Sequence, residues 1–143
     1  MKRVQIKLPD EWLFQTQLTV QISDINYGNH LANDAILRLC HEARLRFFAS
    51  LGYSEMDIAG CAVIMTDAMI QFQGQGFYAD QLNIDIGIQE ITKIGFDLIY
   101  RITRYPDQTA IAIIKTNMVF FDYATQHIQK TPSAFQRILK KSY

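Results

Sequence analysis

The chain has 143 residues, 14 basic and 14 acidic side chains, and 49% hydrophobic residues. This length suits one domain with its own core, and the apolar content excludes intrinsic disorder. Because its formal net charge is zero, the chain lacks the broad positive surface on which nucleic-acid binding relies, and we expect no nucleic-acid partner. Apolar runs are only a few residues long and the N-terminus has no apolar signal-peptide segment, so we expect neither a membrane span nor secretion.

The cysteines and histidines give no sign of a disulfide framework or a metal centre. Cys40 and Cys61 lack C-x-x-C spacing and a secretory context, so we interpret them as reduced, buried thiols of a cytoplasmic protein. His41 and His127 have no acid or cysteine at ligand spacing, and the sequence therefore predicts no metal site.

The first predicted element is a half-buried strand over residues 14–22. Its residues alternate between an apolar face and a face of glutamine and threonine, which is the period of a strand. Polar residues then crowd together over 23–34, where we expect a loop that leads into a helix.

A long helix is predicted over about residues 33–51. Asn33 or Asp34 can cap its start, and Gly52 stands where a helix-ending glycine is common. One broad arc of this helix is apolar: Ile36, Leu39, Cys40, Ala43, Phe47 and Leu51. On the opposite side, Arg38, Glu42 and Arg46 have the spacing of a surface ion-pair ladder, although Glu42 can also be interpreted as an acid that reaches into a site.

Four long strands follow, because from residue 62 onward the period of the pattern is two. We expect them over 62–73, 81–91, 95–105 and 109–121, and their short joints favour antiparallel neighbours. A short terminal helix is predicted to start here, with Thr131 as its cap and Pro132 at the first helical position.

These elements predict a single α+β domain over residues 1–143. The economical arrangement is a curved antiparallel sheet wrapped around the long helix. The second sheet face is also rich in apolar residues, which predicts a partner copy of the chain because a monomer would leave that face wet.

The loop before the helix carries the side chains best placed for chemistry. Asp24 leaves the strand, Gly28 permits a close backbone approach, and His30 lies just before the helix. The free N–H groups and the dipole at a helix start favour negative charge, so an oxygen that becomes anionic in a transition state could lie there.

The ordered pattern resembles the hotdog-fold acyl-CoA thioesterases of the 4-hydroxybenzoyl-CoA thioesterase type. The loop of this family is similar to residues 24–34, DINYGNHLAND, which are also similar to the loop of acyl-carrier-protein thioesterases. The central helix of the 4-hydroxybenzoyl-CoA thioesterase type is similar to residues 35–54, AILRLCHEARLRFFASLGYS. GFYADQLNIDIGI at 76–88 is similar to the start of a family strand, and the whole resemblance covers about residues 14–135. It implies a hotdog fold, an acyl-CoA thioester as the substrate, no cofactor, and a homodimer or homotetramer with the site between subunits.

The resemblance also implies roles for particular residues. Asp24 would activate water or attack the thioester directly, and His30 or Asn26 would orient water or substrate. Tyr27, Gly28, Asn29 and Asp67 are the substrate-binding candidates, with backbone amides near Gly28 and His30 polarising the carbonyl.

Other interpretations stay open. Family members often have D-x-D where this chain has Asp24 and Asn26. Asp24 can be a loop cap, His30 a helix cap, and Asn26 and Asn29 turn formers, while Asp67 lies in an apolar strand where an acid needs a partner. A hotdog enoyl-thioester hydratase and a non-catalytic acyl-thioester-binding protein are the competing functions.

Overall fold

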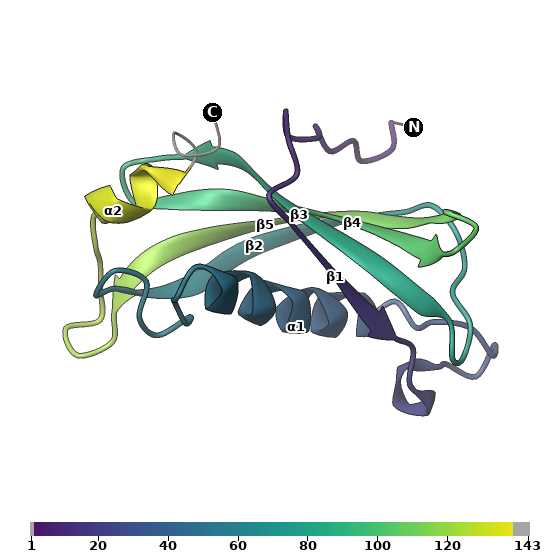
Figure 1. The fold of residues 1–143 in the computed structure, drawn as a ribbon. Helices are drawn as coiled ribbons and strands as arrows, with labels where there is room; N and C mark the ends of the chain where they lie inside the picture. The colour runs from purple at the N-terminus through teal and green to yellow at the C-terminus, as the bar shows by residue number, and fades with distance from the viewer. Residues whose placement is uncertain (1, 139–143) are drawn as a thin grey trace.

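The computed structural model describes residues 2–138 and has the expected α+β architecture (Figure 1). Its elements in chain order are β1 (Phe14–Thr19), the 3-10 turn η1 (Ile22–Asp24), α1 (Ala35–Ser50), β2 (Ala62–Phe72), β3 (Gln81–Ile91), β4 (Gly95–Tyr105), β5 (Ala110–Asp122), β6 (His127–Ile128) and α2 (Ser133–Gln136). The strand order is β1-β3-β4-β5-β2 with β6 beside β5, and all neighbours are antiparallel. The four long strands agree with their predicted bounds within one residue at each end.

The N-terminal strand ends three residues earlier than predicted. Ile22–Asp24 form a 3-10 turn instead of continuing β1, and the Asp24 carboxylate accepts a hydrogen bond from the Gln21 backbone N–H at 2.8 Å. An acid at this position therefore ends the strand by closing a turn, which the alternation of 14–22 did not reveal.

The long helix α1 lies along the inner face of the curved sheet (Figure 1). The predicted apolar arc is buried except for Leu51, which follows the helix and is 37% exposed. Gly52 has a φ of +80°, the left-handed conformation expected just past a helix. Phe47 and Phe48 add ring contacts that connect α1 to Phe14 of β1 and Phe96 of β4.

A buried arginine on α1 joins the helix to the sheet. Arg44 is 4% exposed, and its Nε donates to Glu55 Oε1 at 3.0 Å while Nη1 donates to the Tyr100 hydroxyl at 3.1 Å. Tyr100 also shares a hydrogen bond with Thr116, and burial raises the pKa of Tyr100 to about 12. His41 Nε2 lies 3.1 Å from the same Glu55 oxygen. The loop after α1 is therefore tied to the core by a charged network that the helical pattern did not predict.

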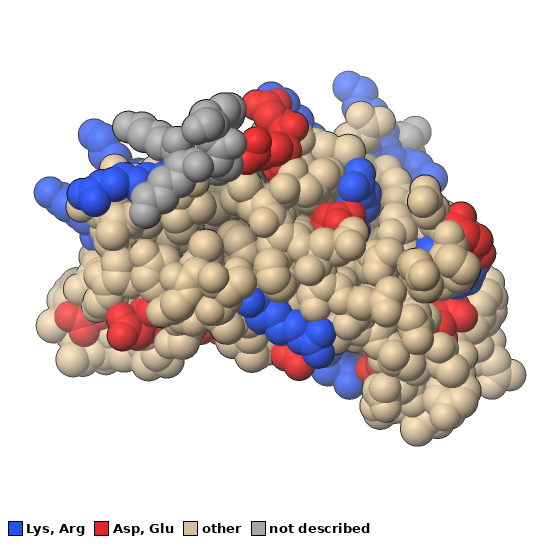
Figure 2. Space-filling model, viewed as in Figure 1, with Lys and Arg blue, Asp and Glu red and all other residues tan. Residues whose placement is uncertain are grey.

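The surface ladder on α1 is only partly formed. Arg46 and Glu42 are paired at 3.6 Å, whereas Arg38 faces Asp24 at 3.8 Å instead. On the face shown in Figure 2, basic and acidic side chains are scattered among uncharged ones, in keeping with the zero net charge.

Part of the outer face of the sheet is covered by the chain itself. Residues 2–13 run in extended form across this face, opposite α1 (Figure 1). A methyl group on Gly87 would lie 2.5 Å from Pro9 Cγ, and the Arg101 guanidinium stacks 4.5 Å above the Trp12 ring. Ile99 on this face has 0% exposure in a single chain. Met69 and Asp67 of β2, which share this face, stay exposed, so the expectation that a partner copy covers the face stays a prediction.

The chain end differs from the prediction in one detail. Pro132, not Thr131, is the N-cap of α2, because the Thr131 hydroxyl donates to the Thr92 carbonyl at 2.8 Å. Within residues 2–138, no helix has the length and apolar character needed to cross a membrane.

The Arg44 network yields a stability prediction. Glu55→Ala leaves a buried guanidinium without its carboxylate, so we expect the free energy of unfolding to fall by about 2–4 kcal/mol in urea denaturation. That figure allows for the 23% exposure of the Glu55 side chain. The control Glu42→Ala removes the exposed pair with Arg46 and should cost about 0.5 kcal/mol or less. Equal costs for the two variants would contradict the role assigned to this network.

Candidate active site

Asn26 shapes the loop that precedes α1. Its side-chain Oδ1 accepts hydrogen bonds from the backbone N–H groups of Gly28 at 2.9 Å and His30 at 3.4 Å. The backbone N–H of Asn26 donates to the His30 carbonyl at 3.0 Å, and Asn29 adopts a φ of +64°. A turn-forming amide and a left-handed asparagine therefore set the backbone that carries His30. Added bulk at Gly28 would crowd the imidazole, because a methyl group there would lie 3.1 Å from His30 Nε2.

The loop is held against the segment between β2 and β3. The Leu31 N–H donates to the Gly76 carbonyl at 2.7 Å, and the Ala32 N–H donates to the Asp24 carbonyl at 2.8 Å. Gly76 lies so close to Leu31 that a methyl group there would be 3.2 Å from Leu31 Cβ. The Gly74-x-Gly76 pattern is thus a loop that packs tightly on the His30 loop.

A cavity of about 170 Å³ lies where these two loops meet the start of α1. His30 and Asn33 supply polar groups, and the remaining lining residues are Leu31, Ile36, Phe72, Gly74, Gln75 and Ile111. The N-cap residue of α1, Asp34, makes no side-chain capping hydrogen bond, so the predicted cap is absent there. The Ala35 N–H donates to the Ala32 carbonyl at 3.1 Å, which leaves the next backbone N–H groups of the first turn as the candidates to bind an anionic oxygen.

Asp24 faces a different hollow. Its side chain is buried, Oδ2 accepts from the Gln21 N–H at 2.8 Å, and Oδ1 lies 3.8 Å from Arg38 Nη2. Together with Arg38, Glu42 and Arg46, it lines a groove of about 430 Å³ between β1 and α1. This groove shares no lining residue with the His30 cavity. The fold therefore brings Asn26, Gly28 and His30 together and separates the Asp24 carboxylate from them.

The other substrate-binding candidates do not line the His30 cavity. Tyr27 is fully exposed at the loop tip. Asp67 lies exposed on β2, where it follows a β-bulge and accepts a hydrogen bond from the Thr66 hydroxyl at 3.2 Å. Sequence reasoning did not select Phe72, Gln75 and Ile111, because contacts between distant segments place them at the cavity.

Alternative reactive groups are poorly placed. Burial raises the pKa of the Cys40 thiol, which keeps it protonated and unreactive. Among residues 2–138, no group of three or more His, Cys, Asp or Glu side chains has the arrangement of a metal site. His30, which is half-buried, is the titratable side chain among the residues that line the cavity.

A comparison with family models identifies one family for this chain. The family model of the thioesterase-like superfamily matches residues 20–139. No curated protein matches the chain by sequence.

Solved structures show the hotdog fold of this chain. A 1,4-dihydroxy-2-naphthoyl-CoA thioesterase from Synechocystis is 20% identical with a TM-score of 0.81, covering 91% of this chain and 98% of that one. A gentisyl-coenzyme A thioesterase is 18% identical with a TM-score of 0.76, covering 86% and 99%. A hypothetical protein from Staphylococcus aureus, solved in complex with CoA, is 16% identical with a TM-score of 0.80, covering 97% and 88%. The fold expected from the sequence is thereby confirmed.

The loop geometry predicts different outcomes for two substitutions at Asn26. Asn26→Ala removes the acceptor of two backbone amides, so the buried Leu31 N–H should exchange with solvent at least about fivefold faster, because a lost hydrogen bond is worth about 1 kcal/mol. Asn26→Asp keeps a side-chain acceptor oxygen for the two backbone N–H groups and should preserve the protection of Leu31. Hydrogen exchange followed by NMR checks both, and unchanged protection in Asn26→Ala would mean that Asn26 does not hold the loop.

Proposed function

The chain belongs to the thioesterase-like superfamily and is a thioester hydrolase, and we propose that it hydrolyses acyl-CoA thioesters in the cavity beside His30. One observation carries this assignment of the site. The same cavity is lined by an imidazole and by the start of a 16-residue helix that has no side-chain cap. A base and a set of anion-binding amides are the two groups that thioester hydrolysis requires.

In the proposed reaction, His30 takes a proton from a water molecule as that water attacks the thioester carbonyl carbon. The carbonyl oxygen becomes anionic in the tetrahedral intermediate, and backbone N–H groups of the first turn of α1 stabilise it. When the carbon–sulfur bond breaks, the imidazolium returns the proton to the leaving thiolate. The products are a free acid and a free thiol.

The proposal changes the role first expected of Asp24. Its carboxylate already accepts the Gln21 N–H and faces Arg38, and it lines the separate groove. We therefore assign Asp24 to closing the turn at the end of β1, which positions the loop, and Asn26 to shaping the loop tip.

Acyl-CoA is the substrate we favour over an acyl carrier protein. The CoA complex of the similar protein from Staphylococcus aureus supports a CoA-type ligand on this fold. Apolar side chains of Leu31, Ile36, Phe72 and Ile111 around the cavity suit an acyl group. A reduced, cytoplasmic setting is in keeping with Cys40 and Cys61, which are both free thiols.

The sheet edge supports a homodimer. β2 is the last strand of the sheet order, and Met65, Met69 and Phe72 on it are 39–43% exposed. Two copies related by a two-fold axis can extend the sheet through antiparallel β2 strands. Antiparallel pairing sets the start of one β2, at Ala62, near the end of the other, at Phe72, so the partner would close the open side of the cavity.

Kinetics distinguish His30 from Asp24 as the base. With a panel of aliphatic and aromatic acyl-CoAs and a chromogenic thiol reagent, His30→Ala should lower kcat at least about 100-fold, the usual loss for a general base. Asp24→Asn keeps an acceptor for the Gln21 N–H and should lower kcat less than about fivefold. A larger loss in Asp24→Asn than in His30→Ala would make the Asp24 carboxylate the base.

The dimer is tested by light scattering coupled to size exclusion. The 16.5 kDa chain should elute with twice its mass, and Met69→Lys should shift it toward monomer by placing a charge on the pairing edge. The control Ile94→Lys changes a residue of similar exposure in the β3–β4 turn and should leave the mass unchanged. A wild-type mass of 16.5 kDa would contradict the dimer.

A further inference from the structure

The wall of the His30 cavity that faces α1 is an irregular segment. Residues 73–80 join β2 to β3 without regular secondary structure, and Gly74 and Gln75 line the cavity. The Gly76 carbonyl accepts the Leu31 N–H, so this segment also supports the residue next to His30. The position of His30 therefore depends on what holds residues 73–80 in place.

Arg104, near the end of β4, binds this segment at two points. Its Nη1 donates to the Gln75 carbonyl at 3.1 Å and lies 3.3 Å from Asp80 Oδ2. Asp80 Oδ2 also accepts the Phe77 N–H at 2.9 Å, and the guanidinium lies 5.8 Å from the centre of the Phe77 ring. One guanidinium thus joins the beginning and the end of the stretch 75–80.

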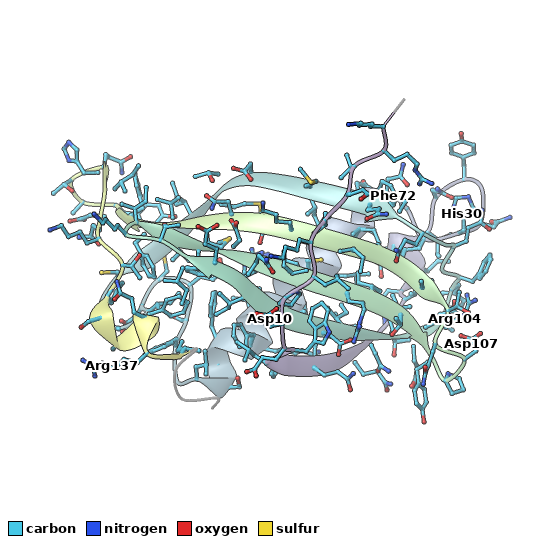
Figure 3. The ribbon with its side chains drawn as sticks, turned by 90° about the horizontal axis from the view of Figure 1, so that it is seen from above. Asp10, His30, Phe72, Arg104, Asp107 and Arg137 are labelled. Carbon is cyan, nitrogen blue, oxygen red and sulfur yellow. The ribbon has the colours of Figure 1, made fainter. Side chains whose placement is uncertain are left out.

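Arg104 is itself fixed by the β4–β5 turn. Its Nε donates to the two carboxylate oxygens of Asp107 at 3.3 and 3.4 Å. The hydrogen bond to Asp80, followed by the interactions with Asp107, raises the pKa of Arg104, so it keeps its charge. Figure 3 shows Arg104 and Asp107 at the same end of the sheet as His30 and Phe72.

The segment has little freedom to move without moving the His30 loop. On one side, Gln73 and Gly74 donate their N–H groups to the Ile111 carbonyl at 2.9 and 3.1 Å. On the other side, Gly76 is packed against the Leu31 side chain. A displacement of Gln75 would therefore pass directly to Leu31 and to the adjacent His30.

We propose that Arg104 is a positioning residue for the hydrolysis reaction, which it serves by holding Gln75 and Gly76 so that they set the placement of His30. Arg104 does not line the cavity and touches no reacting atom. This inference rests on the proposed role of His30.

The test compares kcat and KM for Arg104 variants with a matched control. Arg104→Gln should lower kcat about tenfold or more with KM changed less than about threefold, because small displacements of a catalytic group cost rate. Arg104→Lys keeps the charge without the forked geometry and should recover part of kcat. The control Arg101→Gln removes another arginine–aspartate pair of β4, with Asp85, and should leave kcat within about twofold.

A double-mutant cycle shows whether Arg104 acts through His30. Because two residues that act as a unit are non-additive, Arg104→Gln should lower kcat no further in the His30→Ala background. The inference would be overturned if Arg104→Gln lowered kcat by the same factor in the wild-type and the His30→Ala backgrounds. It would also be overturned if the Arg104→Gln variant kept the wild-type kcat and only its melting temperature fell. Full activity in His30→Ala alone would instead overturn the proposed function.

Hydrogen exchange gives a readout that does not depend on activity. The Leu31 N–H should exchange faster in Arg104→Gln than in wild type, and at the wild-type rate in Arg101→Gln. If Arg104→Gln does not fold, Arg104→Lys takes its place and should show a smaller change in the same direction. Wild-type protection of Leu31 in a folded Arg104 variant would show that the guanidinium does not hold the loop.

Discussion

A single backbone hydrogen bond, from the Leu31 N–H to the Gly76 carbonyl, joins the two loops on which the site depends. One of these loops is shaped by Asn26 and carries His30, and the other lines the cavity with Gly74 and Gln75. Both meet at the uncapped start of α1. Because the bond connects segments 45 residues apart in the chain, the site exists only when the strands that carry these segments are in register.

The rest of the molecule holds that register. Arg44 joins α1 to Glu55 and Tyr100 within the core, so the helix has a defined position along the sheet. The N-terminal residues cover the outer face, where Pro9 packs on Gly87. With α1 on one face of the sheet and residues 2–13 across part of the other, the exposed edge of β2 is the surface best suited to a second copy, and it lies beside the cavity through Phe72.

Local pattern was enough to predict α1 and the four long strands, but not the 3-10 turn at Ile22–Asp24, the short strand β6 or the environment of individual polar side chains. The bounds of the four long strands follow from the period of apolar residues, and Gly52 marks the helix end by its conformation. Asp24 and His30 are six residues apart, and no pattern indicates that a tight turn sends their side chains to separate hollows. The burial of Arg44 and the support that Arg104 gives to Gln75 depend on partners 11 and 29 residues away, which periodicity does not report.

The central claim is that substrate binds on the His30 side of the loop and not on the Asp24 side. An NMR titration of the amide signals with a non-hydrolysable acyl-CoA thioether tests this claim directly. We predict that the shifts concentrate at residues 30–36 and 74–76, around the uncapped helix start. Shifts concentrated at residues 17–24 and along the Arg38–Arg46 side of α1 would contradict it and place the chemistry in the groove with Asp24.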